Sequence, residues 1–83
     1  MSGSAEERRR RIRHFLLHQL LEEPDLDLSD DDALFSSGLV DSFSAVRLLA
    51  FLQNEFGARI DGVGLEDLDT VHKCAALTDG IAD

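Results

Sequence analysis

The chain has 83 residues, of which 43% are hydrophobic, so it is long enough for one small domain with a modest core. Its net charge of −9 at pH 7 disfavours nucleic acid and anionic membranes as main partners, because their phosphates would be repelled. The single cysteine, Cys74, excludes an internal disulfide and suits a reducing cytoplasm, which is the expected localisation.

Residues 5–22 are predicted to form the first helix. Ser4 and Glu7 have the spacing of a capping box, apolar residues follow with a period near 3.6, and Pro24 ends the pattern. Residues 1–4 are expected to be a flexible N-terminus, without the apolar stretch of a secretory signal. The arginine-rich run at residues 8–13 is interpreted as a solvated helix face, with docking to an acidic partner as the alternative.

Residues 24–41 are predicted to form a long loop. A loop of this length in a compact domain needs anchors, and Leu28, Leu34, Phe35 and Leu39 are expected to pin it onto the core. A short helical turn is expected around residues 31–35. The acidic run at residues 30–32 lacks the glycine and terminal glutamate of an EF-hand loop, so it is interpreted as a solvated turn.

The second helix is predicted to begin at Asp41 or Ser42 and to end at Gly57, a residue typical of helix C-caps. A brief helical turn is expected at residues 65–68, and a last helix, capped by Asp69 or Thr70, is expected to end near Gly80. The whole chain, residues 1–83, is therefore predicted to be a single all-α domain built as a small helical bundle. The apolar stripe expected inside the second helix comprises Val46, Leu49, Ala50, Leu52 and Phe56.

The residues that could carry chemistry do not form a catalytic or metal-binding set. His14 and His18 lie four apart on one helical face, but no nearby side chain completes a ligand set. Ser42 lacks a general base, and Val40 and Ser44 occupy the glycine positions of a G-x-S-x-G elbow. We therefore predict no catalytic residue and no metal site, and from its own surroundings Ser42 is a helix N-cap or first-turn residue.

A longer sequence pattern around Ser42 indicates a second possible role for this residue. The stretch "ALFSSGLVDSFSAVRLLAFLQNEFGARI" resembles the core signature of acyl carrier proteins, with Asp41-Ser42-Phe43 at its centre, and the similarity extends over roughly residues 12–78. The resemblance implies a four-helix bundle with a long loop between its first two helices and a short third helix. It also implies that Ser42 bears a covalent 4′-phosphopantetheine arm whose thiol holds acyl groups as thioesters, so that the protein is a carrier and not an enzyme.

The resemblance also implies a set of partners. A phosphopantetheinyl transferase would move the arm from coenzyme A with the help of Mg²⁺, a ligase or transferase would load the acyl or aminoacyl cargo, and downstream synthases or transferases would use it. Asp41, Phe43, Ser44 and Arg47 are the residues expected to present Ser42 and to be recognised by these enzymes. A serine at a helix N-terminus would place the phosphodiester near unpaired backbone N–H groups and the positive end of the helix dipole. The protein is expected to act as a monomer, without nucleic acid or membrane.

Departures from the family pattern leave several alternatives open. Arg47 stands where fatty-acid carriers often have a glutamate, which favours dedicated partners in a polyketide-like or other specialised pathway. Phe43 is shared with D-alanyl-type aminoacyl carriers, and a peptidyl carrier is a further alternative. Outside the carrier class, the chain could be a degenerate carrier fold acting as an interaction module, or a docking domain that uses the arginine run. Ala50, expected at an interior position, predicts room for cargo between the helices.

Overall fold

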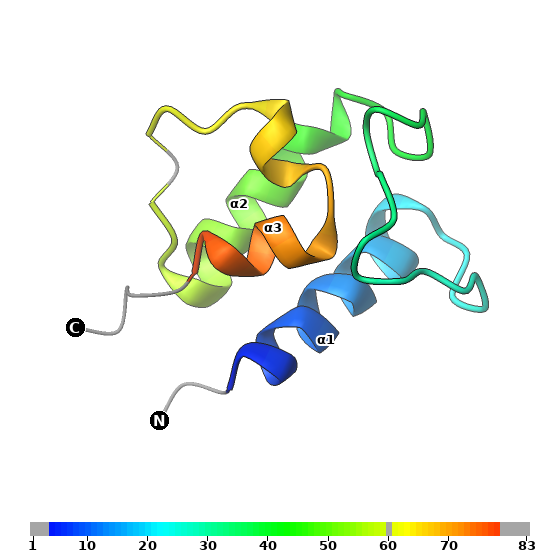
Figure 1. Cartoon of the computed structure of the whole chain (residues 1–83), viewed down its shortest axis with the longest axis horizontal. Coiled ribbons are helices and arrows are strands. Elements are labelled where there is room, and N and C mark those ends of the chain that lie inside the picture. The colour runs from blue at the N-terminus through cyan, green and yellow to red at the C-terminus, as the bar shows by residue number, and fades with distance from the viewer. Residues whose placement is uncertain (1–3, 60, 79–83) are drawn as a thin grey trace.

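In the computed structural model, residues 4–59 and 61–78 are described, and they form helices and loops without a strand (Figure 1). The elements are α1 (Ala5–Phe15), the π-helix η1 (Leu16–Leu20), α2 (Ser44–Phe56), the 3₁₀-helix η2 (Leu65–Leu68) and α3 (Val71–Ala76). The predicted all-α class is confirmed for these residues. They contain three α-helices, and η2, a 3₁₀-helix, lies where the short third helix of a four-helix bundle was expected. No helix among them is both long enough and apolar enough to span a bilayer.

The ends of the helices follow from local side-chain chemistry. The Ser4 hydroxyl accepts the backbone N–H of Glu7 at 3.2 Å and so caps α1, as predicted. Thr70 caps α3 in the same way, with its hydroxyl 3.0 Å from the Lys73 nitrogen. Gly57 ends α2 in the left-handed conformation (φ 69°), which glycine adopts without steric cost. α3 ends at Ala76, with Leu77 as its C-cap, so the predicted end near Gly80 was wrong. Residues 1–3 of the expected flexible N-terminus lie outside the described residues.

A single hydrophobic core joins all the helices with the long connection between η1 and α2. α1 packs against α3, and α3 packs against η2. Burial of the leucine and isoleucine side chains in this core contributes roughly 1.5–3 kcal/mol each in transfer free energy. The side chains that are fully buried are Ile12, Leu16, Leu34, Leu48, Leu52, Leu68, Val71 and Cys74.

The long connection gathers at the end of the molecule where η1 stops and α2 begins (Figure 1). Leu28 and Leu34 are buried and Phe35 packs partly against the core, as predicted. Leu39 is 38% exposed, so its prediction as an anchor was wrong. Val40, which follows it, is 3% exposed and takes the inward position instead.

The helical turn predicted around residues 31–35 is also wrong. Two separate hydrogen-bonded turns, at residues 29–32 and 35–38, lie on either side of Leu34. In the first turn the Asp32 N–H donates to the Ser29 carbonyl at 3.3 Å, and in the second the Gly38 N–H donates to the Phe35 carbonyl at 3.1 Å. Burial of Leu34 between these turns bends the chain inward where a continuous helical turn would have carried it along the surface.

The arginine run is bound within the chain. Arg9 and Arg13 both form ion pairs with Asp30 in the long connection. Arg11 pairs with Glu55 of α2 and lies over the Phe56 ring, 4.9 Å from its centre. These contacts tie α1 to two segments that are distant in sequence, so the basic residues have a role in the fold that neither interpretation of the run included.

The interior of α2 differs from the predicted stripe. Leu52 is buried and Leu49 and Phe56 pack partly against the core, as predicted. Val46 and Ala50 are exposed, and Ala45 and Leu48 are buried in their place. The prediction that Ala50 leaves interior room for cargo is therefore wrong. Phe51 is partly buried instead, and its ring stacks on that of Phe15 from α1 with centres 4.1 Å apart.

Candidate functional site

Ser42 lies in a tight turn that leads into α2. The Ser44 N–H donates to the Asp41 carbonyl at 2.9 Å, and the Ala45 N–H donates to the Ser42 carbonyl at 3.1 Å. The Asp41 carboxylate accepts the Phe43 N–H at 2.9 Å. Asp41 therefore caps the turn that leads into α2. The helix itself begins at Ser44, with Phe43 at its N-cap position, two or three residues later than predicted.

The Ser42 side chain is presented to solvent. The residue is exposed, and its hydroxyl engages no hydrogen-bond partner among the described residues. The expectation that unpaired backbone N–H groups surround Ser42 was wrong for Phe43, Ser44 and Ala45, whose N–H groups are all bonded to Asp41 or Ser42. The positive end of the α2 dipole remains as the local source of attraction for a phosphate.

The chain just before Ser42 is held at both of its ends. Leu34 and Val40 are buried, and the Val40 N–H donates to the Leu34 carbonyl at 2.8 Å, which closes residues 34–40 into a compact loop. Gly38 within this loop has a φ of 81°, a backbone conformation that most other residues adopt only with strain. Asp41 and Ser42 follow directly, so their position depends on this loop.

Asp69, which the sequence suggested only as a helix cap, holds the same loop from the η2–α3 junction. Its carboxylate accepts the N–H groups of Phe35 and Ser36 at 2.7 and 2.9 Å and the Ser36 hydroxyl at 2.6 Å. These donors, the Ser36 hydroxyl first, lower the pKa of Asp69 below its ordinary value of 3.8 because they stabilise the charged form. No sequence signal links residues 33 or 34 positions apart, so this contact could not be predicted.

Two apolar side chains lie exposed beside Ser42. Phe43 is 85% exposed and Val46 is 70% exposed, and residues three apart on a helix are neighbours on its surface. We call Phe43 and Val46 the apolar patch. Exposed apolar groups that are contiguous commonly mark contact surfaces, which agrees with the prediction for Phe43, whereas Val46 was assigned to the core.

The charges of α2 also matter for recognition. Its two charged residues are Arg47, which is exposed, and Glu55, which is paired with Arg11. The predicted recognition residue Ser44 is half-buried. α2 therefore presents an apolar and cationic surface, and its one carboxylate is already neutralised by α1.

The other candidates form no site. The His14 and His18 rings stack with centres 4.0 Å apart, and the described residues bring no group of three or more metal-binding side chains together. Cys74 is buried, and its thiol approaches the Leu68 carbonyl at 3.5 Å. Burial, with a smaller contribution from the charge of Asp69, raises the pKa of the Cys74 thiol to about 12, so the thiol is protonated and inert at neutral pH.

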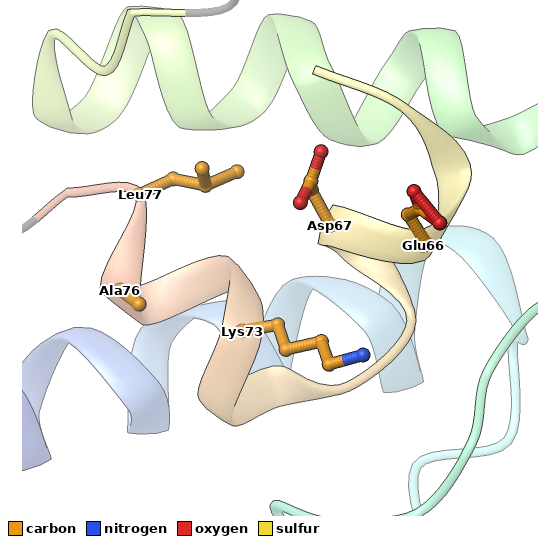
Figure 2. Close-up of a pocket in the computed structure, with 5 residues that line it drawn as sticks. All are labelled: Glu66, Asp67, Lys73, Ala76 and Leu77. Carbon is orange, nitrogen blue, oxygen red and sulfur yellow. The ribbon is translucent and has the colours of Figure 1, made fainter.

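A shallow hollow lies between η2 and α3 (Figure 2). Its volume is about 410 Å³. Three of the residues that line it, Glu66, Asp67 and Lys73, are charged, and its apolar wall is formed by Ala76 and Leu77. A second hollow of about 240 Å³ lies between η2 and the loop before Ser42, against Phe35 and Asp69. None of the predicted site residues lines either of these two hollows.

An exposed serine at the turn into a helix can be reached by other proteins. Comparison with known families agrees: the family model described as "Phosphopantetheine attachment site" matches residues 15–77. The chain belongs to the phosphopantetheine attachment family. A comparison with curated proteins found no match.

Membership makes the chain a carrier protein with covalent 4′-phosphopantetheine as its prosthetic group. Domains of this family are not catalytic themselves, and they interact with phosphopantetheinyl transferases and with synthase enzymes. The residues around Ser42 fit the group, because the residue is exposed and its hydroxyl forms no hydrogen bond with a described residue. When bound, the arm would supply a terminal thiol.

Proposed function

We propose that this chain is an acyl carrier protein and that Ser42 bears its 4′-phosphopantetheine arm. The observation that carries the proposal is the solvent-exposed Ser42 hydroxyl at the turn into α2, next to the Asp41 cap. Ser42 Oγ would form the new bond to the phosphorus of the phosphopantetheine group of coenzyme A. The bond from that phosphorus to 3′,5′-ADP would break, and a base of the transferase would take the hydroxyl proton.

The role proposed for the chain itself is presentation. Asp41 fixes the turn through its bond to the Phe43 N–H, and the apolar patch, Phe43 and Val46, gives the transferase and later enzymes a surface to bind. Because the base and the metal belong to the transferase, the absence of a catalytic partner beside Ser42 suits the proposal. We also propose a cytoplasmic monomer, in keeping with the single, buried thiol of Cys74.

Intact mass spectrometry tests the attachment. The chain is incubated with coenzyme A, Mg²⁺ and a broad-specificity phosphopantetheinyl transferase, and the parent is expected to gain one phosphopantetheine. Ser42→Ala is expected to gain none, whereas Ser44→Ala, which keeps Ser42, is still expected to gain one phosphopantetheine. No addition to a folded parent would refute the proposal and favour a carrier-like fold that acts as an interaction module.

We further propose that the pathway is polyketide-like or otherwise specialised, with aminoacyl or peptidyl cargo as the alternatives. The support is the surface of α2, where Arg47 is exposed and Glu55 is paired, so basic partners that dock on acidic carriers would be repelled or weakly held. Loading enzymes for acyl groups and for amino acids, each added to the holo form, separate the cargo classes by the mass gained.

Reversing the charge of Arg47 tests the pathway proposal separately. Arg47→Glu should speed transfer of an acyl group from a fatty-acid-type transferase several-fold, because it restores attraction to a basic docking surface. Gln53→Glu, which adds a negative charge at an exposed position nearer the far end of α2, serves as the control for a general effect of charge. An equal rate for Arg47→Glu and the parent would contradict the pathway proposal and leave the role of Ser42 intact.

A further inference from the structure

Asp69 is joined to the loop before Ser42 by four hydrogen bonds. One oxygen of its carboxylate accepts the N–H groups of Phe35 and Ser36, and the other accepts the Ser36 hydroxyl. Its backbone carbonyl also accepts the Leu34 N–H at 2.7 Å. A single residue at the η2–α3 junction thus binds three consecutive residues of the loop.

The three hydrogen bonds to the Asp69 carboxylate are charge-assisted. The carboxylate is ionised at neutral pH, since its donors hold the pKa of Asp69 below the ordinary value. Hydrogen bonds to an ionised acceptor are roughly twice as strong as those between neutral groups. The two backbone N–H groups also have no helix or sheet partner, so without Asp69 they would have to turn toward water.

The loop transmits this constraint to Ser42 over a short path. Asp69 fixes residues 34–36, the Val40 N–H bonds back to the Leu34 carbonyl at 2.8 Å, and both Leu34 and Val40 are buried. Ser42 lies two residues beyond Val40 and has no side-chain bond of its own to a described residue. Its orientation therefore depends on the loop and on the turn into α2.

We infer that Asp69 is a positioning residue for the modification of Ser42. By clamping residues 34–36, it limits the directions in which the Ser42 hydroxyl can be presented to the transferase. The inference rests on the proposed function of Ser42. Asp69 touches neither the arm nor coenzyme A, and it acts only through the loop.

Replacement of Asp69 is expected to lower kcat of the transferase for this carrier more than it raises KM. The apolar patch, Phe43 and Val46, belongs to the start of α2 and is not bonded to Asp69, so docking of the transferase should be preserved. A loosened loop would lower the fraction of docked complexes in which Ser42 Oγ is aligned with the phosphorus. Misplacement of a reacting group by about 1 Å can cost roughly 100-fold in rate, so a partial loosening should cost about tenfold.

Steady-state loading by the transferase, followed by mass spectrometry, gives kcat and KM for the carrier. Asp69→Ala is expected to lower kcat about tenfold with KM within about twofold of the parent. Asp69→Asn keeps an oxygen for the two N–H groups and should fall between Asp69→Ala and the parent. The matched control is Asp67→Asn, because the Asp67 carboxylate accepts the N–H of Gly64, the N-cap of η2, at 3.0 Å and forms no hydrogen bond with the described residues of the loop before Ser42.

Amide hydrogen exchange on the folded parent provides a second measurement. The Phe35 and Ser36 amides should be protected in the parent. In Asp69→Asn these two amides should exchange faster, with the α2 amides unchanged. Unprotected Phe35 and Ser36 amides in the parent would overturn the inference. So would equal kcat and KM for Asp69→Ala and Asp67→Asn on proteins shown to be folded. In both cases a loaded parent would leave the proposed function standing, whereas a folded parent that is never loaded would refute that function first.

Discussion

Replacing Leu34 by alanine removes three carbon atoms from a side chain that is 0% exposed, although it belongs to a loop. At about 0.8 kcal/mol per buried methylene, the lost transfer free energy is about 2.4 kcal/mol. A cavity term is added where the surroundings do not collapse, and buried Leu→Ala changes span about 2–5 kcal/mol. Because a loop can relax more than a helix, we expect a loss near the lower end, about 2–3 kcal/mol of the free energy of unfolding.

This loss would be large for the protein. A chain of this length typically has a free energy of unfolding of roughly 4–12 kcal/mol, so Leu34→Ala would remove a substantial share of it. The reason is the position of Leu34, which holds the long connection onto the core next to the clamp formed by Asp69.

Urea unfolding followed by far-UV circular dichroism measures the effect, since the chain contains no tryptophan or tyrosine for fluorescence. The matched control is Phe43→Ala, which deletes a larger apolar side chain that is 85% exposed. We expect the control to change the free energy of unfolding by no more than about 0.5 kcal/mol. A Leu34→Ala protein within about 0.5 kcal/mol of the parent, or a control that loses as much as Leu34→Ala, would refute the reasoning from burial.

Three further predictions follow from charged and titratable groups. Asp30→Asn should destabilise the protein by about 1 kcal/mol, because it weakens the partly exposed ion pairs with Arg9 and Arg13. Urea unfolding at low salt measures this loss. A loss that is equally large at high salt would contradict an ionic origin. Because the pKa of Asp69 is lowered, its contribution to stability is present above pH 3.8 and is lost as the pH falls through the still lower folded-state pKa. The free energy of unfolding of Asp69→Asn should therefore fall less steeply between pH 5 and pH 2 than that of the parent. Equal slopes for the two proteins would contradict a stabilising role of the Asp69 carboxylate. Cys74, whose pKa is raised to about 12, should not react with a thiol reagent at pH 8 in the folded protein without the arm, and it should react after unfolding. A reactive thiol in the folded, loaded protein would then belong to the arm. Rapid labelling of the folded protein without the arm would contradict the burial of Cys74.

The sequence by itself determined the features that depend on neighbours along the chain. Ser4 and Thr70 cap helices because each hydroxyl reaches an N–H three residues ahead, and Gly57 ends α2 because glycine tolerates a positive φ. The change from polar to apolar residues at Ser42 likewise marked the entry to a helix. Residues one helical turn apart are close in the sequence, so the positions of these helix ends could be predicted to within about two residues.

The face that α2 buries was decided by the tertiary structure. Its sequence offers two apolar stripes at helical spacing, one through Ala45, Leu48 and Leu52 and the other through Val46 and Ala50. The first stripe faces the core and the second faces solvent. Periodicity alone cannot choose between them, because the choice depends on where α1 and α3 lie.

The contacts that hold the long connection were likewise decided only in three dimensions. Asp30 meets Arg13 across 17 positions, and Asp69 meets Ser36 across 33 positions. Neither aspartate stands in a motif, and each sits among other acidic residues that look equivalent in the sequence. Their different roles arise because folding brings donors from distant segments within hydrogen-bond distance of these two carboxylates, whereas Asp32 and Asp67 bond, among the described residues, only to N–H groups three residues away. Local spacing therefore located Ser42, and long-range contacts fixed the loop that presents it.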